Sequence, residues 1–300
     1  MSNLESLLIG ARPKTLLISL APFILGTSLA YNVNRYVNIA LAMFTLLLFV
    51  VLQIFANYSN DYLDYINGKD TLKRRGPLRI TQSGLLSIKS IQNFLILLLW
   101  LVVFLACIVG HLSHQNELFI LFFIIFSLAF GWLYTGGPLH LGYRGFGELM
   151  VFLSFGPLGV FTSYYLQLAN LLPNFEVLIS SISCGLIASS VLVVNNLRDK
   201  ASDKYTKKNT LCVLLGKSFC QIEYVSILLG GCLISFILLI KNQSNFILLY
   251  FLICLFVNAL RLSRFIFLVK TSTQYNWLLA KTSQFLLLYS CLISLSLIIK

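Results

Sequence analysis

Nine stretches of apolar residues constrain this chain more than any other feature of its sequence. A helix needs about 18 or more consecutive apolar residues to cross the hydrocarbon core of a bilayer. The stretches fall at about 15–31, 38–58, 91–111, 117–135, 148–168, 175–195, 223–241, 245–263 and 278–299. Runs of this length favour helices, which satisfy their backbone polar groups internally in lipid. The sequence therefore predicts an all-α, multi-span membrane protein with nine transmembrane helices.

The composition excludes a soluble fold. Apolar residues make up 58% of the 300 residues and charged residues only 11%, whereas ordinary globular proteins have about 25% charged residues. The seven cysteines are scattered and form no C-x-x-C pair. Neither a zinc site nor a disulfide framework is therefore expected.

The lysines and arginines are sorted to one side of the predicted membrane. With nine spans, 19 of the 22 basic residues fall on the side of the N-terminus, and only Arg35, Lys241 and Lys300 fall on the other. Loops rich in lysine and arginine stay in the cytoplasm. We therefore expect an inner (plasma) membrane protein with its N-terminus and its two long loops, about 59–90 and 196–222, in the cytoplasm. This sorting explains most of the net charge of +12 without a nucleic-acid partner.

All five aspartates of the chain lie in these two long loops. The first group is Asn57, Asn60, Asp61, Asp64 and Asp70, and the second is Asn195, Asn196, Asp199 and Asp203. If the spans continue as helices, residues four apart share a face, so Asn57 aligns with Asp61 and Asn195 with Asp199.

The repeated spacing suggests that the second and sixth spans are counterparts in an internal duplication. The expected halves are about 15–135 and 148–263, followed by a ninth helix at 278–299, within one domain of residues 1–300. Such an arrangement places both aspartate groups over a shared cavity.

Carboxylates gathered at one cavity mouth require a cation. Two carboxylates about 6 Å apart repel by roughly 3 kcal/mol at an effective dielectric constant of about 20. Aspartate and asparagine oxygens favour a hard cation such as Mg²⁺, which is commonly shared with substrate phosphates. A substrate with a diphosphate head and a lipid tail suits this site, since a metal ion stabilises the leaving diphosphate. The expected Mg²⁺ ligands are Asn57, Asp61, Asp64, Asn195, Asp199 and Asp203, of which the four aspartates are the expected catalytic residues.

The motifs around these residues resemble a known family. The patterns N-x-x-x-D-x-x-D after the second span and N-x-x-x-D-x-x-x-D after the sixth resemble the UbiA superfamily of intramembrane prenyltransferases. Five further motifs resemble its 1,4-dihydroxy-2-naphthoate polyprenyltransferase branch: Ala11–Thr15, Gly76–Arg79 with Gln82 and Gly84, Tyr134–Pro138, Gly145–Glu148 and Asn195–Asp199. The resemblance covers about residues 11–220 and implies nine helices around a central cavity, capped on the cytoplasmic side by two Asp-rich loops.

The resemblance implies a Mg²⁺-dependent transfer of a polyprenyl group from polyprenyl diphosphate to an aromatic acceptor. In this branch the acceptor is 1,4-dihydroxy-2-naphthoate, the ring carboxylate leaves as CO₂, and the product is demethylmenaquinone. Other acceptors stay open, namely 4-hydroxybenzoate, homogentisate or a futalosine-pathway intermediate. A more distant alternative is an ion-coupled transporter, although transporters bind ions near the bilayer midplane and no aspartate lies in mid-span here.

Other polar residues near the two groups are expected to contact substrate. Lys14, Lys73, Arg79, Arg198 and Lys208 are candidates for the diphosphate. Gln82, Tyr134 and Arg144 are candidates for the acceptor, and Asn60 and Asn196 complete the substrate-binding set. Glu148 opens the fifth span, where it is either a functional intramembrane acid or, as we expect, a favourable charge at a helix N-terminus.

Overall fold

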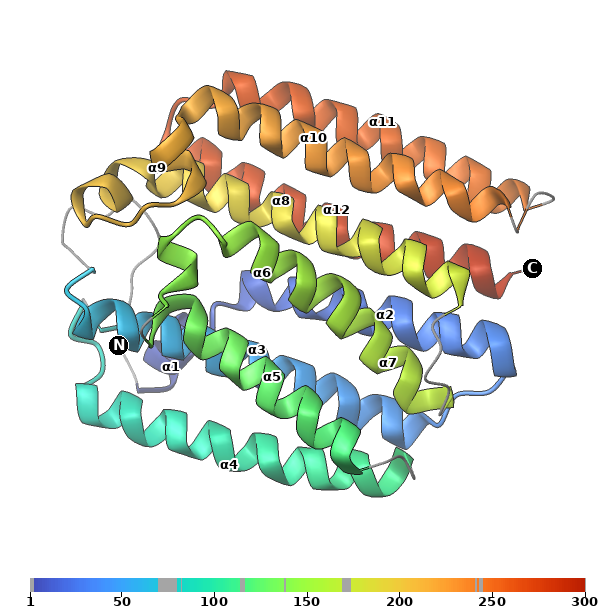
Figure 1. Ribbon diagram of the computed structural model, residues 1–300, viewed down its shortest axis with the longest axis horizontal. Helices are drawn as coiled ribbons and strands as arrows, with labels where there is room; N and C mark the ends of the chain where they lie inside the picture. The colour runs from blue at the N-terminus through green and yellow to red at the C-terminus, as the bar shows by residue number, and fades with distance from the viewer. Residues whose placement is uncertain are drawn as a thin grey trace.

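The chain forms a bundle of long helices. The computed structural model describes residues 3–69, 80–81, 83–113, 117–137, 139–168, 174–240, 242 and 245–299, without the side chains of residues 3, 4, 14 and 117. The helices, shown in Figure 1, are α1 (Asn3–Ala11), α2 (Pro13–Asn34), α3 (Ile39–Ile66), α4 (Ile88–Ser113), α5 (Glu117–Thr135), η1 (Leu141–Tyr143), α6 (Gly147–Leu153), η2 (Ser154–Leu158), α7 (Gly159–Leu168), α8 (Phe175–Tyr205), α9 (Leu211–Leu215), α10 (Lys217–Ser235), η3 (Phe236–Ile240), α11 (Phe246–Leu268) and α12 (Ser272–Ile298).

The prediction of nine spans is confirmed within the described part of the chain. Nine helical segments there are long and apolar enough to cross a membrane. Seven of them each consist of one helix, whereas α6, η2 and α7 together form the span Gly147–Leu168, and α10 and η3 form Lys217–Ile240. The chain is therefore a multi-pass membrane protein.

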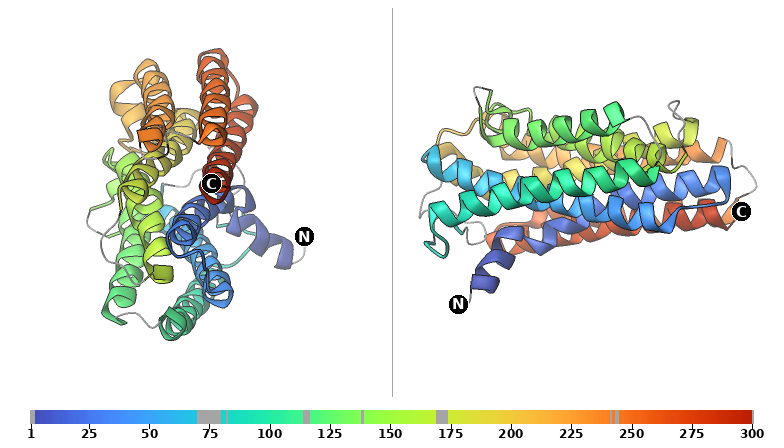
Figure 2. Two further views of the ribbon diagram at one scale, coloured as in Figure 1. Left: turned by 90° about the vertical axis from the view of Figure 1, so that its right-hand side faces the viewer. Right: turned by 90° about the horizontal axis from the view of Figure 1, so that it is seen from below.

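The spans lie side by side in two rows, as the end-on view in Figure 2 shows. One row consists of α4, α3, α2, α12 and α11, and the other of α5, α6–α7, α8 and α10. The rows pack against each other through α3 on α5, α2 on α7, α12 on α8 and α11 on α10. Helices α1 and α9 lie at one end of the bundle, and the chain finishes at the other (Figure 1).

Buried apolar residues form two core clusters. The larger joins α2, α7, α8, α10, α11 and α12, with Leu25 and Ile187 fully buried in it. The smaller joins α3, α4 and α5, with Leu48 and Leu105 almost fully buried in it. The two clusters are separate, and the site described below lies between α3, α5 and α8.

The aspartates lie on helices, which differs from the expectation of Asp-rich loops. Asp61 and Asp64 belong to the last turns of α3, and Asp199 and Asp203 to those of α8; Asp70 lies outside the described residues. The apolar runs end near residues 58 and 195, but both helices continue because their polar faces turn inward. An apolar run in the sequence marks only the part of a helix that contacts lipid. A helix that lines an internal cavity can continue past the end of that run. The i,i+4 alignment expected of continued helices is therefore present.

Glycine permits close contact between neighbouring spans, both across the two rows and within one row. A Cβ atom on Gly26 of α2 would lie 2.3 Å from the Val160 carbonyl oxygen of α7. A Cβ atom on Gly185 of α8 would lie 2.6 Å from the Phe152 carbonyl oxygen. Small residues at such contacts let membrane helices approach closely enough for van der Waals packing.

We predict that Gly26→Ala destabilises the protein by about 1–3 kcal/mol, because the added methyl group overpacks the α2–α7 contact. The matched control is Gly230→Ala in the membrane-spanning helix α10, where an added Cβ atom meets nothing within 4 Å. Thermal unfolding in detergent measures both variants. A melting temperature for Gly26→Ala equal to that of Gly230→Ala would contradict the packing account.

Candidate active site

A cavity of about 310 Å³ lies between the two rows of helices. Its walls come from α2, α3, α5, α6, η2 and α8, and from the segments 142–143 and 206–210 that cover it. Its polar lining consists mainly of Arg12, Thr15, Gln53, Asn57, Asn60, Asp64, Lys69, Tyr134, Thr135, Tyr143, Asn195, Asn196, Asp199, Asp203, Thr206 and Lys208. Apolar side chains line the remainder, among them Phe49, Phe123, Phe130 and Met150. Both aspartate groups therefore border one cavity that also has an apolar wall.

Asp64 connects α3 to the segments that cover the cavity. Its carboxylate accepts a hydrogen bond from the Tyr143 hydroxyl and forms an ion pair with Lys208, whose Nζ lies 2.7 Å away. The Lys208 ammonium also lies over the Tyr143 ring, 4.6 Å from its centroid. Because all three side chains are buried, this contact fixes residues far apart in the sequence at the cavity mouth.

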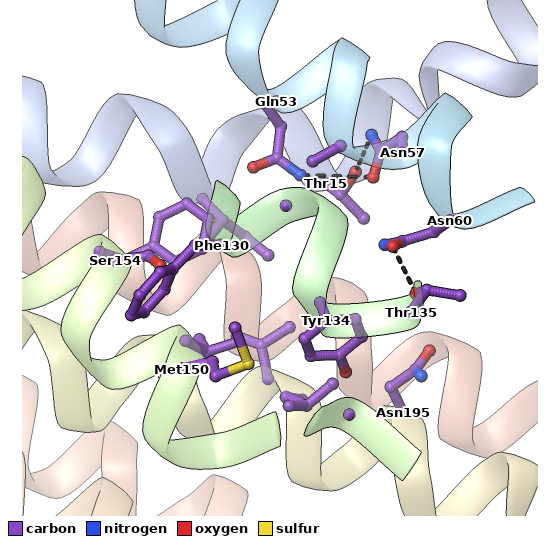
Figure 3. A pocket seen from close by; sticks show the side chains of 18 of the residues that line it. Thr15, Gln53, Asn57, Asn60, Phe130, Tyr134, Thr135, Met150, Ser154 and Asn195 are labelled. Atoms are coloured by element: carbon purple, nitrogen blue, oxygen red, sulfur yellow. Dashed lines mark hydrogen bonds between the residues drawn. The ribbon is translucent and has the colours of Figure 1, made fainter. Parts of the chain in front are cut away.

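The asparagines of α3 are held by hydrogen bonds to neighbouring helices, as Figure 3 shows. Asn57 donates to the Ala11 carbonyl oxygen at 2.9 Å. It also donates to the Thr15 hydroxyl at 3.1 Å, and Gln53 of the same helix donates to Asn57 Oδ1 at 3.3 Å (Figure 3). The Thr135 hydroxyl donates to Asn60 Oδ1 at 2.6 Å. These contacts orient the amides toward the cavity that both asparagines line.

Asp61 sits behind the cavity wall. It is 1% exposed and is not among the residues that line the cavity. Its carboxylate forms an ion pair with Arg12, and Arg12 does line the cavity. Arg12 separates α1 from α2 with a left-handed backbone, at φ 51°, a conformation that is uncommon for a residue other than glycine.

On α8, Arg198 holds the second aspartate group in place. Its guanidinium donates two hydrogen bonds of 2.8 Å to the two carboxylate oxygens of Asp199, and a third of 2.6 Å to Asn195 Oδ1. A fourth reaches Asn276 Oδ1 of α12 at 2.9 Å. Arg198 itself is buried and does not line the cavity. Its hydrogen bonds orient Asp199 and Asn195, and its expected contact with the diphosphate stays a prediction.

The donor set around the cavity fits a hard divalent cation. Asn57, Asn60, Asp64, Asn195, Asp199 and Asp203 present carboxylate and amide oxygens, which are the ligands that Mg²⁺ takes in proteins. Among the described residues, no group of three or more His, Cys, Asp or Glu side chains is close enough to hold a metal ion by itself. The set therefore suits an ion that keeps waters and shares ligands with a substrate phosphate, as Mg²⁺ commonly does.

The remaining predicted residues either do not line the cavity or lie outside the described part of the chain. Arg144 is exposed and does not line the cavity. The side chain of Lys14 and the whole of Asp70, Lys73, Arg79 and Gln82 lie outside the described residues. Arg144 and these five therefore stay predictions.

Seven of the polar residues named above as lining the cavity were missed by the sequence analysis: Arg12, Thr15, Gln53, Lys69, Thr135, Tyr143 and Thr206. Arg12 and Thr135 lie inside the motifs Ala11–Thr15 and Tyr134–Pro138, so the resemblance to the family could have pointed to them as site residues. Lys69 donates from Nζ to the Thr206 carbonyl oxygen at 2.7 Å, and Tyr143 binds Asp64. Both contacts join segments distant in the sequence, which no local pattern predicts.

Carboxylates, basic side chains and an apolar wall within one cavity of a membrane bundle define an intramembrane enzyme for an amphiphilic substrate. Comparison with known proteins identifies the family. The model of the UbiA prenyltransferase family matches residues 19–289, and the chain belongs to that family. It is therefore an enzyme that transfers prenyl groups.

Individual relatives agree with this assignment. A 1,4-dihydroxy-2-naphthoate octaprenyltransferase of Escherichia coli is 35% identical, over 77% of this chain and 75% of its own. A protein of the same name from Mycobacterium tuberculosis is 34% identical, over 81% of this chain and 80% of its own. A structure of a UbiA homologue from Archaeoglobus fulgidus, bound to GPP and Mg²⁺, has a TM-score of 0.70 at 16% identity, over 96% of this chain and 99% of that one. That likeness shows the same fold.

We predict that Arg198→Met destabilises the protein by about 3–5 kcal/mol, because it removes the bidentate partner of the buried Asp199 carboxylate. Lys204→Met is the control, since Lys204 is an exposed basic residue on the same helix. Thermal unfolding in detergent measures the difference. Equal stability of the two variants would show that Arg198 serves only the charge sorting of the loops.

Proposed function

We propose that this enzyme transfers a polyprenyl group from polyprenyl diphosphate to 1,4-dihydroxy-2-naphthoate, with loss of CO₂, to give demethylmenaquinone. The observation that carries the proposal is the single cavity that joins both Asn/Asp groups to an apolar wall. The choice of acceptor is supported by four bacterial relatives that bear this activity as their name and are 33–37% identical over most of the chain.

The polar part of the cavity is the proposed diphosphate site. Arg12, Lys69 and Lys208 line it and supply positive charge, and basic side chains bind phosphate oxygens through charge-assisted hydrogen bonds. Lys14, Lys73 and Arg79 remain candidates for further contacts. A diphosphate that enters competes with Asp64 for Lys208 and with Asp61 for Arg12.

Mg²⁺ is the proposed cofactor. Asn57, Asp64, Asn195, Asp199 and Asp203 would hold it, and Asp61 would act beside them through Arg12. When bound, Mg²⁺ stabilises the negative charge that develops on the leaving diphosphate. The UbiA homologue whose structure is bound to GPP and Mg²⁺ supports this choice of ion.

The apolar part of the cavity is the proposed place of the reacting prenyl carbons. Loss of diphosphate leaves an allylic cation, which water would quench, so the cavity must exclude water. Aromatic rings such as Phe49, Phe123 and Phe130 line this part and stabilise positive charge through their π-faces. The acceptor ring enters beside Tyr134 and Asn196, and its nucleophilic carbon attacks the prenyl carbon that loses the diphosphate.

The proposed orientation places the N-terminus and the diphosphate site on the cytoplasmic side of the inner (plasma) membrane. The excess of basic residues on that side supports it. The aspartate-bearing ends of α3 and α8 lie at the same end of the bundle as α1 (Figure 1), which agrees with a water-soluble diphosphate head approaching from the cytoplasm.

The first test supplies the purified protein in liposomes with Mg²⁺, an all-trans polyprenyl diphosphate and a panel of aromatic acids. We expect a prenylated product from 1,4-dihydroxy-2-naphthoate, with the mass of one CO₂ lost, and no product after chelation of Mg²⁺. A product only from 4-hydroxybenzoate, homogentisate or a futalosine-pathway intermediate would change the acceptor. Flux of a labelled solute without any prenyl transfer would favour the transporter.

The second test replaces one carboxylate of each group. We predict that Asp64→Asn and Asp199→Asn each lower kcat by about 100-fold or more, because each removes charge that holds the leaving group and its cation. The control is Glu176→Gln, a buried acid at the opposite end of α8. Unchanged kcat in either aspartate variant, with the protein folded, would remove that residue from the site.

A further inference from the structure

Glu148 is a buried acid to which the proposed diphosphate site assigns no role. It lies in the first turn of α6 within a membrane-spanning segment, is 8% exposed, and does not line the cavity. An ionisable side chain inside a membrane protein is costly and is usually retained for a function. A charge that only served the helix N-terminus would not require burial against another span.

The carboxylate of Glu148 contacts α8. Its Oε1 accepts a hydrogen bond of 2.7 Å from Nδ2 of Asn196, and Ser189 of the same helix donates to the Glu148 carbonyl oxygen at 2.8 Å. Glu148 Oε2 is buried and has no hydrogen-bond partner among the described residues. Among the described residues, Asn196 is therefore the hydrogen-bond partner of the Glu148 side chain.

This contact fixes the orientation of the Asn196 amide. Glu148 Oε1 accepts from Asn196 Nδ2, so the NH₂ end of the amide faces Glu148. Oδ1 is then the remaining end of a side chain that lines the cavity, and no described residue donates to it. Glu148 thereby makes Asn196 a hydrogen-bond acceptor for whatever fills the cavity.

Tyr134 lies close to the contact between Glu148 and Asn196. A Cβ atom on Gly147, the neighbour of Glu148, would lie 3.3 Å from the Tyr134 hydroxyl and 3.1 Å from Leu192, which is one turn before Asn196 on α8. Tyr134 lines the cavity, and its hydroxyl has no hydrogen-bond partner in the part of the chain that is described. In Figure 3 it lies between Asn195 on the polar side and Met150 and Phe130 on the apolar side.

We propose that Glu148 is a positioning residue that holds Asn196 to accept a hydrogen bond from a ring hydroxyl of the aromatic substrate, with Tyr134 as the second contact. This inference rests on the proposed function and names the group that is recognised. An amide oxygen accepts a hydrogen bond from an O–H donor and repels the carboxylate of an aromatic acid. The hydroxyl therefore anchors the ring while its carboxylate points elsewhere.

Two substitutions of Glu148 separate this role from that of a helix charge. Glu148→Gln keeps the reach and an acceptor oxygen but loses the charge, whereas Glu148→Asp keeps the charge and loses the reach. The proposal predicts that Glu148→Asp raises KM for the acceptor about tenfold, as loss of one buried hydrogen bond does, while Glu148→Gln stays within about threefold. KM for the prenyl diphosphate stays within about twofold in both.

The opposite ranking, with Glu148→Asp like wild type and Glu148→Gln impaired, would overturn the proposal in favour of a helix charge. A rise in KM for prenyl diphosphate rather than for the acceptor would also overturn it, since Asn196 would then serve the diphosphate.

If Glu148→Asp does not fold, Asn196→Leu and Tyr134→Phe test the same contacts. Each is expected to raise KM for the acceptor about tenfold with KM for prenyl diphosphate within about twofold, and unchanged KM for the acceptor in both would contradict the proposal. The wild-type enzyme, measured in parallel, separates failure of this inference from failure of the proposed function. Wild type that prenylates no hydroxylated aromatic acid would refute the proposed function itself.

Discussion

The burial of carboxylates inside a membrane bundle is the constraint on which the rest of this structure depends. Asp61, Asp64 and Asp199 are each almost fully buried, and each is paired with a basic side chain, namely Arg12, Lys208 and Arg198. Breaking such a pair costs about 3–5 kcal/mol, because it leaves a buried charge without compensation. These basic residues therefore stabilise the fold even in the absence of substrate.

The three ion pairs differ in whether their basic side chain lines the cavity. Arg198 donates four hydrogen bonds, to Asp199, Asn195 and Asn276, which hold its side chain in place. Arg12 and Lys208 border the cavity and are placed where a diphosphate would meet them. If a diphosphate took these two basic side chains from their carboxylates, the freed carboxylate oxygens would be available to a divalent cation, and binding of the cation would be coupled to binding of the substrate.

Much of this could be predicted from the sequence. The nine spans follow from hydropathy, and the spacing of Asn57 with Asp61 and of Asn195 with Asp199 follows from helix geometry. The ends of α3 and α8 could not be predicted from hydropathy, because a helical face that lines a polar cavity has the composition of a loop. Contacts such as Lys208 with Asp64 or Asn196 with Glu148 join residues far apart in the chain, so only the fold reveals them.

The central claim is that Asp64 and Asp199, on different helices, act on one magnesium diphosphate. A double-mutant cycle tests it most directly, with Asp64→Asn, Asp199→Asn and the double variant, by measuring Kd for a non-hydrolysable polyprenyl diphosphonate with and without Mg²⁺. The account predicts a coupling energy of about 1 kcal/mol or more in Mg²⁺ that vanishes on chelation, as expected for residues in one network. Additive losses in Mg²⁺, or coupling that persists without it, would contradict a shared ligand.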